Sequence, residues 1–151
     1  MAGFRWTIPV ALLLAVGLQA QEMPSGWKVV KDLQGKCQLA VPPDWVPDSL
    51  VKSFVNSADG KSNAVAHPSR PGQSFSEVTA LAKQVMPPTK SLEDSAQRVW
   101  YAYTTNNSAQ GATNWYIAVP GTPICTAQVT FKVAADEAIA KKIALSLTQA
   151  K

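Results

Sequence analysis

The chain has 151 residues, of which 46% are hydrophobic and 16% charged, and its formal net charge is +4. This length suits one domain, and the composition is too apolar for a disordered protein. The basic residues are scattered, with only Lys141 and Lys142 adjacent, whereas proteins that bind nucleic acids gather such residues on one face. Nucleic acid is therefore excluded as the expected partner.

The first 20 residues predict a secretory signal peptide. Arg5 is the only charged residue of this segment, and an apolar run follows from Ile8 to Leu18. A run of about 11 residues fits the core of a signal peptide and is too short for a bilayer-spanning helix, which needs about 20. We expect cleavage after Ala20. Cleavage after Gly17 is the alternative site, and an uncleaved membrane anchor is the alternative outcome.

Cleavage after residue 20 defines the expected organisation of the mature protein. Loss of Arg5 lowers the net charge from +4 to +3. The mature protein is expected to be exported, either periplasmic or secreted, without a stable membrane span. Residues 21–26 are expected to form a short flexible leader, and residues 27–149 a single domain.

The first half of this domain is predicted to consist of strands separated by turns. Pro42 and Pro43 lack the N–H groups that a strand needs, so they end the strand before them. Asp59–Gly60 between alternating segments is typical of a hairpin turn. The strands are expected over residues 27–31, 37–41, 50–56 and 62–67.

A helix is predicted over residues 74–86. Ser74 and Glu77 have the spacing of a capping box, in which each side chain satisfies a backbone N–H at the start of a helix. Pro87 and Pro88 end the pattern. One apolar stripe at helical spacing, expected to pack against a sheet, is formed by Val78, Leu81, Ala82, Val85 and Met86.

The second half predicts three strands and a final helix. The strands are expected over residues 97–105, 114–119 and 124–133, and the helix over residues 135–149. In that helix Ile139, Ile143 and Leu147 recur at four-residue steps. Because the strand segments are separated by short turns, we expect an α+β domain in which an antiparallel sheet packs with two helices.

The two cysteines, Cys37 and Cys125, predict one disulfide. An exported chain with a small, even number of cysteines usually pairs them. In the alternating strand over residues 124–133, Cys125 shares the core-facing set with Val129 and Phe131. The alternative is that both residues are buried free thiols.

The sequence resembles the PsbP-like fold, named for an extrinsic subunit of the oxygen-evolving photosystem. The resemblance is carried by the strand and Pro-x-x-Trp turn of residues 37–45, the capped helix, the later strands, and residues 143–147 of the last helix. It covers roughly residues 27–149. The resemblance implies a small exported binding or assembly domain rather than an enzyme, and it assigns no functional residues, because one fold hosts many activities.

No motif in the sequence predicts catalysis, a metal or a cofactor. His67, the only histidine, precedes Pro68 at the end of a predicted strand and has no nucleophile elbow to serve. Asp44 with Asp48, and Glu93 with Asp94, are carboxylate pairs without the spacing of a calcium loop. An unrecognised hydrolase using His67 remains as a third hypothesis.

The candidate ligand-binding residues are five aromatic side chains on two neighbouring predicted strands: Trp100, Tyr101, Tyr103, Trp115 and Tyr116. Alternation puts one set on each face of the sheet. An open aromatic face would suit a sugar, a peptide or a protein partner. The alternative is that helices cover both faces and every ring belongs to the core. Trp45 is interpreted either as a contact residue or as a plug at the end of the sheet.

These observations favour an exported, non-enzymatic binding domain that interacts with a protein or an envelope component. The alternative function is that of a small-ligand carrier, with a pocket between sheet and helix lined by the five aromatic residues. Pockets of this kind are concave and mostly apolar, with a few polar groups.

Overall fold

The computed structural model describes residues 23–151. The predicted signal peptide and the first two residues of the predicted leader lie outside the described residues. The leader and its boundary with the domain therefore stay predictions. The next leader residues include a turn in which the Trp27 N–H donates to the carbonyl oxygen of Pro24 at 3.2 Å.

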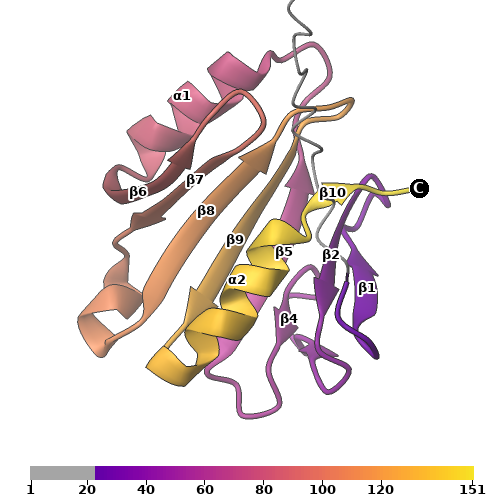
Figure 1. Cartoon of the computed structure of the whole chain (residues 1–151), viewed down its shortest axis with the longest axis vertical. Coiled ribbons are helices and arrows are strands. Elements are labelled where there is room, and N and C mark those ends of the chain that lie inside the picture. Colours follow the sequence, from indigo (N-terminus) through magenta and orange to yellow (C-terminus); the bar gives the residue numbers. More distant parts are fainter. Residues whose placement is uncertain (1–22) are drawn as a thin grey trace, which may run out of the picture.

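The described chain forms an α+β domain with two antiparallel sheets and two α-helices, as expected (Figure 1). The larger sheet has seven strands in the order β3-β4-β5-β9-β8-β7-β6, and the smaller has three in the order β1-β2-β10. The elements are β1 (Lys28–Lys31), β2 (Cys37–Val41), β3 (Val46–Pro47), β4 (Val55–Asn56), β5 (Ser62–Pro68), α1 (Phe75–Val85), β6 (Pro88–Asp94), β7 (Val99–Tyr103), the 3-10 helix η1 (Asn106–Gln110), β8 (Thr113–Val119), β9 (Cys125–Phe131), the 3-10 helix η2 (Ala134–Asp136), α2 (Glu137–Leu145) and β10 (Thr148–Gln149).

The two helices lie on opposite faces of the seven-stranded sheet (Figure 1). Helix α2 and strand β2 cover one face and enclose the larger core, which includes Leu39, Ile117 and Ile143. Helix α1 covers the β7–β8 part of the other face, over a smaller core that includes Tyr101 and Ala118. Alternation along each strand sends successive side chains into different cores.

A disulfide joins Cys37 of β2 to Cys125 of β9, with the two Cα atoms 5.6 Å apart. The predicted pairing is therefore confirmed. Both cysteines are fully buried, and the bond ties the small sheet to the middle of the large one. It closes a long loop, with a sequence separation of 88 residues.

The turn between β1 and β2 depends on the buried side chain of Asp32. Its carboxylate accepts the backbone N–H groups of Gln34 at 2.6 Å, Lys36 at 2.8 Å and Cys37. Burial raises the pKa of Asp32, but these three bonds to the charged form outweigh it and hold the pKa below its ordinary value. The carboxylate thereby fixes the chain just before the disulfide.

Helix α1 begins as predicted, but its apolar stripe is only partly buried. Ser74 and Glu77 form both bonds of the capping box. The side of the helix that meets the sheet carries Thr79 and Ala82, whereas Leu81 and Val85 are exposed. The expectation that the whole stripe packs on the sheet is wrong, because the tyrosines beneath α1 meet a narrower strip of the helix.

Three further strand predictions need correction, each for a physical reason. Residues 50–54 form a loop, and only residues 55–56 of the predicted strand pair, as β4 with β3 and β5. Strand β6 was not predicted, because it is an edge strand with six of seven residues exposed and therefore shows no alternation. Four strands, not three, thus lie between α1 and α2. Strand β3 was missed because it follows a proline-rich segment and has only two residues.

The last helix is shorter than predicted. It ends at Leu145, where the Ser146 side chain donates to the carbonyl oxygen of Ile143 and accepts the N–H of Ala40 in β2. The chain then forms β10, which pairs with β2. Pairing with the small sheet has displaced the last turn of the expected helix.

We expect removal of the disulfide by the double substitution Cys37→Ala and Cys125→Ala to lower the free energy of unfolding by roughly 2–4 kcal/mol, because the unfolded chain regains the freedom of a long loop. Urea denaturation of both proteins measures the difference. An unchanged denaturation midpoint would contradict this account of the bond.

We expect Asp32→Ala to destabilise the fold by about 1–3 kcal/mol at neutral pH, because three N–H groups lose their acceptor. Since the folded state lowers the pKa of Asp32, its contribution is present above the unfolded pKa and is lost as the pH falls through the folded pKa. Urea denaturation at pH 7 and near pH 2 should therefore show a smaller difference between wild type and variant at the lower pH. Equal differences at both pH values would refute the assigned role of the charge.

Candidate functional site

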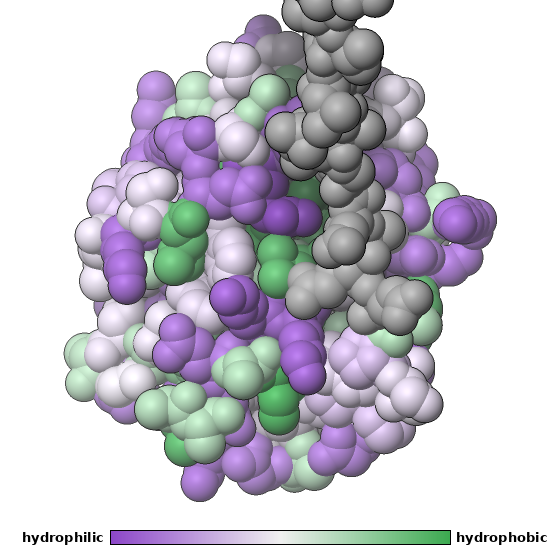
Figure 2. Space-filling model, viewed as in Figure 1, coloured by the Kyte–Doolittle hydropathy of each residue, from purple (hydrophilic) through white to green (hydrophobic). Residues whose placement is uncertain are grey.

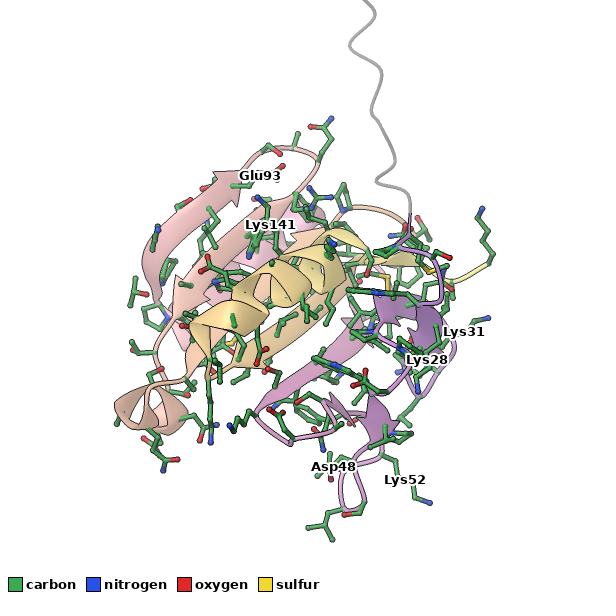
Figure 3. All side chains as sticks on the ribbon, turned by 60° about the horizontal axis from the view of Figure 1, so that its bottom comes forward. Lys28, Lys31, Asp48, Lys52, Glu93 and Lys141 are labelled. Atoms are coloured by element: carbon green, nitrogen blue, oxygen red, sulfur yellow. A yellow bond between two sulfur atoms is a disulfide. The ribbon has the colours of Figure 1, made fainter. Side chains whose placement is uncertain are left out.

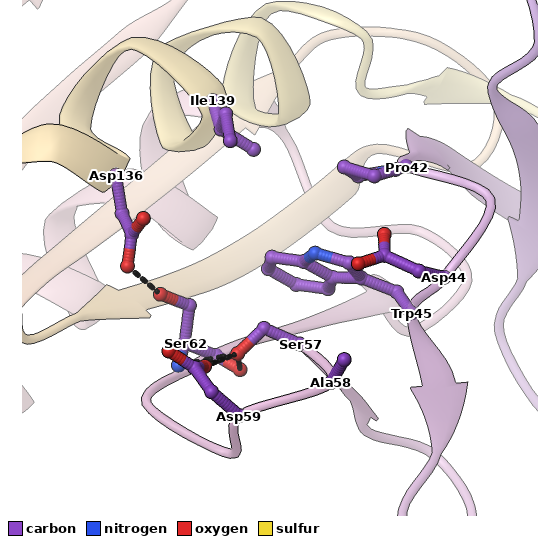
Figure 4. Close-up of a pocket in the computed structure, with 9 residues that line it drawn as sticks. All are labelled: Pro42, Asp44, Trp45, Ser57, Ala58, Asp59, Ser62, Asp136 and Ile139. Carbon is purple, nitrogen blue, oxygen red and sulfur yellow. Dashed lines mark hydrogen bonds between the residues drawn. The ribbon is translucent and has the colours of Figure 1, made fainter.

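A cavity of about 300 Å³ lies where the segments flanking the β3–β4 pair meet the start of α2 (Figure 4). Three sequence segments line it, and they come together only in the folded chain. Its walls combine carboxylates, hydroxyls and apolar groups. The lining residues are Pro42, Asp44, Trp45, Ser57, Ala58, Asp59, Ser62, Asp136 and Ile139. We call this cavity the Trp45 pocket.

Trp45 is placed in the pocket by the turn that ends β2. The proline at position 42 stops the strand, and its carbonyl oxygen accepts the Trp45 N–H at 3.2 Å. The Lys28 ammonium donates to the carbonyl oxygen of Trp45. The side chain is only 4% exposed, and the indole lies between Pro42, Ile139 and Ser62 (Figure 4). The indole N–H makes no hydrogen bond to residues 23–151 and, unlike that of Trp100, is not among the fully buried atoms without a partner.

A tight turn between β4 and β5 forms the second wall. Gly60 takes a φ of +70°, which a glycine adopts without strain. The Ser57 hydroxyl donates to Asp59 at 2.7 Å and accepts the Ser62 N–H at 3.0 Å. The bond from Ser57, followed by one from the Lys61 N–H, holds the pKa of Asp59 below its ordinary value. Asp59 is therefore ionised at neutral pH.

Asp136, just before α2, forms the third wall. Its carboxylate accepts the Ser62 hydroxyl at 3.1 Å, which connects η2 to the start of β5. Asp44 stands on the exposed segment opposite. Among residues 23–151 the ion pairs join Lys83 to Asp94 and Arg98 to Glu93, so no pocket carboxylate forms an ion pair with a described side chain. The charge of Lys61 acts on Asp59 without an ion pair. The pocket is therefore acidic.

An exposed apolar loop lies beyond the pocket, at the far end of the β3–β4 pair. Leu50 is 91% and Val51 51% exposed, and the segment over residues 48–54 that contains them, between β3 and β4, is called the apolar loop below. Val46, in β3 before this loop, is 52% exposed. Figure 3 shows Asp48 and Lys52 at this end of the molecule, whereas Lys28 and Lys31 of β1 lie farther away. On the visible face over α2, by contrast, the apolar residues are separate spots among hydrophilic ones (Figure 2).

The apolar loop is held in shape by Asp48. Its carboxylate accepts the N–H groups of Leu50 and Val51, each at 2.8 Å, and the side-chain amide of Asn56 at 2.7 Å. The bonds from Val51, Asn56 and Leu50, in that order, hold the pKa of Asp48 below its ordinary value. The backbone N–H groups that a strand would have paired across the sheet are thus used locally.

The five aromatic residues proposed as ligand contacts do not form one surface. Trp100 and Trp115 lie in the core beneath α2, with ring centroids 5.0 Å apart. Tyr101, Tyr103 and Tyr116 lie in the core beneath α1. All five are between 1% and 6% exposed. Helices therefore cover both sets, and none of the five lines the Trp45 pocket, so their contact with a ligand stays a prediction.

The three tyrosine side chains are buried, and burial favours the protonated form of their hydroxyl groups. Burial raises the pKa of Tyr101 to about 12, with a further contribution from Tyr103. Burial also raises the pKa values of Tyr103 and Tyr116. The Tyr101 hydroxyl and the Trp100 indole N–H are buried without a hydrogen-bond partner among residues 23–151. These phenols remain neutral at physiological pH.

The other candidate residues are also accounted for. His67 is exposed at the end of β5, and its carbonyl oxygen accepts the Thr126 hydroxyl at 3.2 Å. Glu93 and Asp94 each form an ion pair with a cation. In residues 23–151 no three histidine, cysteine, aspartate or glutamate side chains are grouped to hold a metal ion. The same part of the chain contains no helix long and apolar enough to cross a membrane.

Sequence reasoning gave Trp45 two interpretations and did not single out Asp59 or Asp136. The sequence showed the turn signal at residues 58–61 and the acidic start of the last helix. It did not show that these two segments are in contact, because Ser62 and Asp136 are 74 residues apart in the chain.

No protein-family model and no curated protein matches the sequence. Among solved structures, the chain is similar to the solution structure of cyanobacterial PsbP (CyanoP) from Synechocystis sp. PCC 6803. The sequence identity is 8%, the TM-score is 0.51, and the match covers 82% of this chain and 92% of that chain. At this identity the likeness shows the fold alone. The protein is thus a small α+β domain with the PsbP-like fold that the resemblance implied.

We expect Asp48→Ala to release the apolar loop, because the N–H groups of Leu50 and Val51 lose their acceptor. Hydrogen exchange followed by NMR should show faster exchange of both amides, while amides in β9 are unchanged. Asp48→Asn, which keeps a side-chain oxygen, is the matched control and should retain most of the protection. Unchanged exchange at both amides in the alanine variant would contradict the role of Asp48.

Proposed function

We propose that this protein is an exported, non-enzymatic binding domain that recognises a protein partner through the apolar loop. The observation that carries the proposal is an ordered loop that holds Leu50 91% exposed. An exposed leucine at the tip of a fixed loop gains free energy only when another surface covers it. Burial in an interface supplies that surface.

The order of the loop favours binding over chance exposure. A flexible loop would lose conformational freedom when it docks, which reduces affinity. Here the three bonds to Asp48 fix the loop before a partner arrives. Preorganised apolar side chains at the centre of a contact, with charges around them, are typical of protein interfaces. Lys52, which lies near Asp48 at this end of the molecule, would supply a charge at the rim (Figure 3).

Export is supported by two independent observations. The first 20 residues have the pattern of a signal peptide. The disulfide between Cys37 and Cys125 suits an oxidising compartment. Together they favour a periplasmic or secreted protein.

The second candidate function, a small-ligand carrier, is supported by the Trp45 pocket. A cavity of about 300 Å³ is at the lower end of the range for small-molecule sites. Its lining differs from the aromatic lining first expected, because Trp45 is the one aromatic residue that contributes to it. Three carboxylates also make it more polar than most carrier sites.

We expect a photo-crosslinking amino acid placed at Val51 to give discrete protein adducts in cells of the native host, because the partner covers the apolar loop. The matched control has the same amino acid at Val85, an exposed valine on α1. Leu50→Ser, introduced into the variant that carries the crosslinker at position 51, should reduce the amount of adduct about tenfold, as loss of an interface anchor does.

Mass spectrometry of the adduct bands identifies the partner and the crosslinked peptide. Equal labelling at positions 51 and 85, or adducts unaffected by Leu50→Ser, would refute the proposal. Adducts to lipid or glycan alone would replace the protein partner with another envelope component.

A further inference from the structure

The Trp45 pocket has an unbalanced negative charge. Asp44, Asp59 and Asp136 come from three different segments and face the same cavity (Figure 4). No described side chain forms an ion pair with any of them, although the chain as a whole is basic. Two of the three accept a serine hydroxyl, one bond each. Since a carboxylate accepts up to about four hydrogen bonds, each retains free acceptor sites.

A second feature of the pocket is independent of its acidity. The Trp45 side chain is only 4% exposed. Its indole N–H makes no hydrogen bond to residues 23–151 and, unlike the Trp100 N–H, is not among the fully buried atoms without a partner, so it is an open donor at the wall of the pocket. A ligand that carries a hydrogen-bond acceptor beside its cation would supply a partner for this donor.

We propose that the Trp45 pocket receives an arginine side chain of the protein partner. The inference rests on the proposed function, because it names the partner group that enters beside the apolar loop. A guanidinium has five donors in one plane and remains charged at any physiological pH. Carboxylates on three sides of the cavity provide acceptors for such a fork.

The apolar part of the pocket fits the rest of an arginine residue. Pro42 and Ile139 line the wall next to Trp45 (Figure 4). The methylene groups of an arginine pack against surfaces of this kind while the charged end makes hydrogen bonds. The backbone carbonyl of the same residue is an acceptor for the open Trp45 N–H. The cation, the apolar stem and the acceptor thus belong to one residue.

The position of the pocket favours a side chain that belongs to a docked protein. Trp45 directly precedes β3, Ser57 directly follows β4, and the apolar loop joins these two strands. A partner that covers Leu50 therefore lies within reach of the pocket along a two-residue strand pair. One protein can occupy both features at once.

The test is an NMR titration of the purified protein, in which the Trp45 indole N–H signal reports on the pocket. The probe is the capped peptide acetyl-Gly-Arg-Gly-amide. Its matched controls are the same peptide with citrulline, which is neutral but of similar shape, and with leucine. The arginine peptide should shift the Trp45 indole signal in a saturable way at millimolar concentrations, and the two neutral peptides should shift it at least about fivefold less.

Three variants locate the effect. Asp44→Asn should weaken binding of the arginine peptide roughly fivefold, as loss of a solvent-accessible ion pair does. Asp44 makes no hydrogen bond among the described residues, so this change leaves the fold intact. Asp59→Asn is a second variant with the same expectation. Asp94→Asn on β6, far from the pocket, is the control and should bind as wild type does.

Equal shifts with the arginine and citrulline peptides, or unchanged affinity in both pocket variants, would overturn the proposal. A neutral sugar such as glucose that shifts the indole signal more than the arginine peptide would also overturn it. If the arginine peptide does not bind but Leu50-dependent adducts still form in cells, the arginine proposal is refuted and the proposed function stands. Binding of the peptide without such adducts supports the pocket chemistry and refutes the apolar loop as the docking surface.

Discussion

The attachment of β2 to the large sheet is the constraint on which the rest of the structure depends. Strand β2 pairs with β1 on one side and β10 on the other, and the disulfide fixes its first residue to β9. Its apolar side chains Leu39 and Val41 complete the core beneath α2. The chain then turns at Pro42 and delivers Trp45 to the pocket. Both candidate binding features therefore inherit their position from one anchored strand.

Strand alternation divides the aromatic side chains between two environments. Trp100 and Trp115 meet edge to face and pack with Phe131 beneath α2. The tyrosines occupy the opposite face, where the ring centroids of Tyr101 and Tyr116 are 5.1 Å apart. This division lets a small domain fill two cores with few large residues. The exposed side chains Leu50 and Val51, in the segment between β3 and β4, belong to neither core.

Local signals in the sequence were sufficient for much of the fold. The Ser74–Glu77 capping box, the prolines after β2 and the two cysteines each act over few residues or have one available partner. The strand prediction was wrong for residues 50–54, because Asp48 accepts the N–H groups of Leu50 and Val51 in place of a neighbouring strand. The Trp45 pocket could not be predicted, because it requires β2, the turn at Gly60 and the start of α2 to meet. The contact between these three segments depends on tertiary packing, which no local sequence pattern predicts.

The two edge strands of the seven-stranded sheet differ in structure, but both disfavour pairing with a further strand. Strand β3 is two residues long, and β6 begins with Pro88 and pairs irregularly with β7 at two places. Short, proline-bearing and bulged edges are poor templates for another strand. The seven-stranded sheet is thus protected from pairing edge to edge with the same sheet of another copy. A contact made through this sheet therefore depends on side chains, and it can form and separate without breaking the hydrogen bonds between strands.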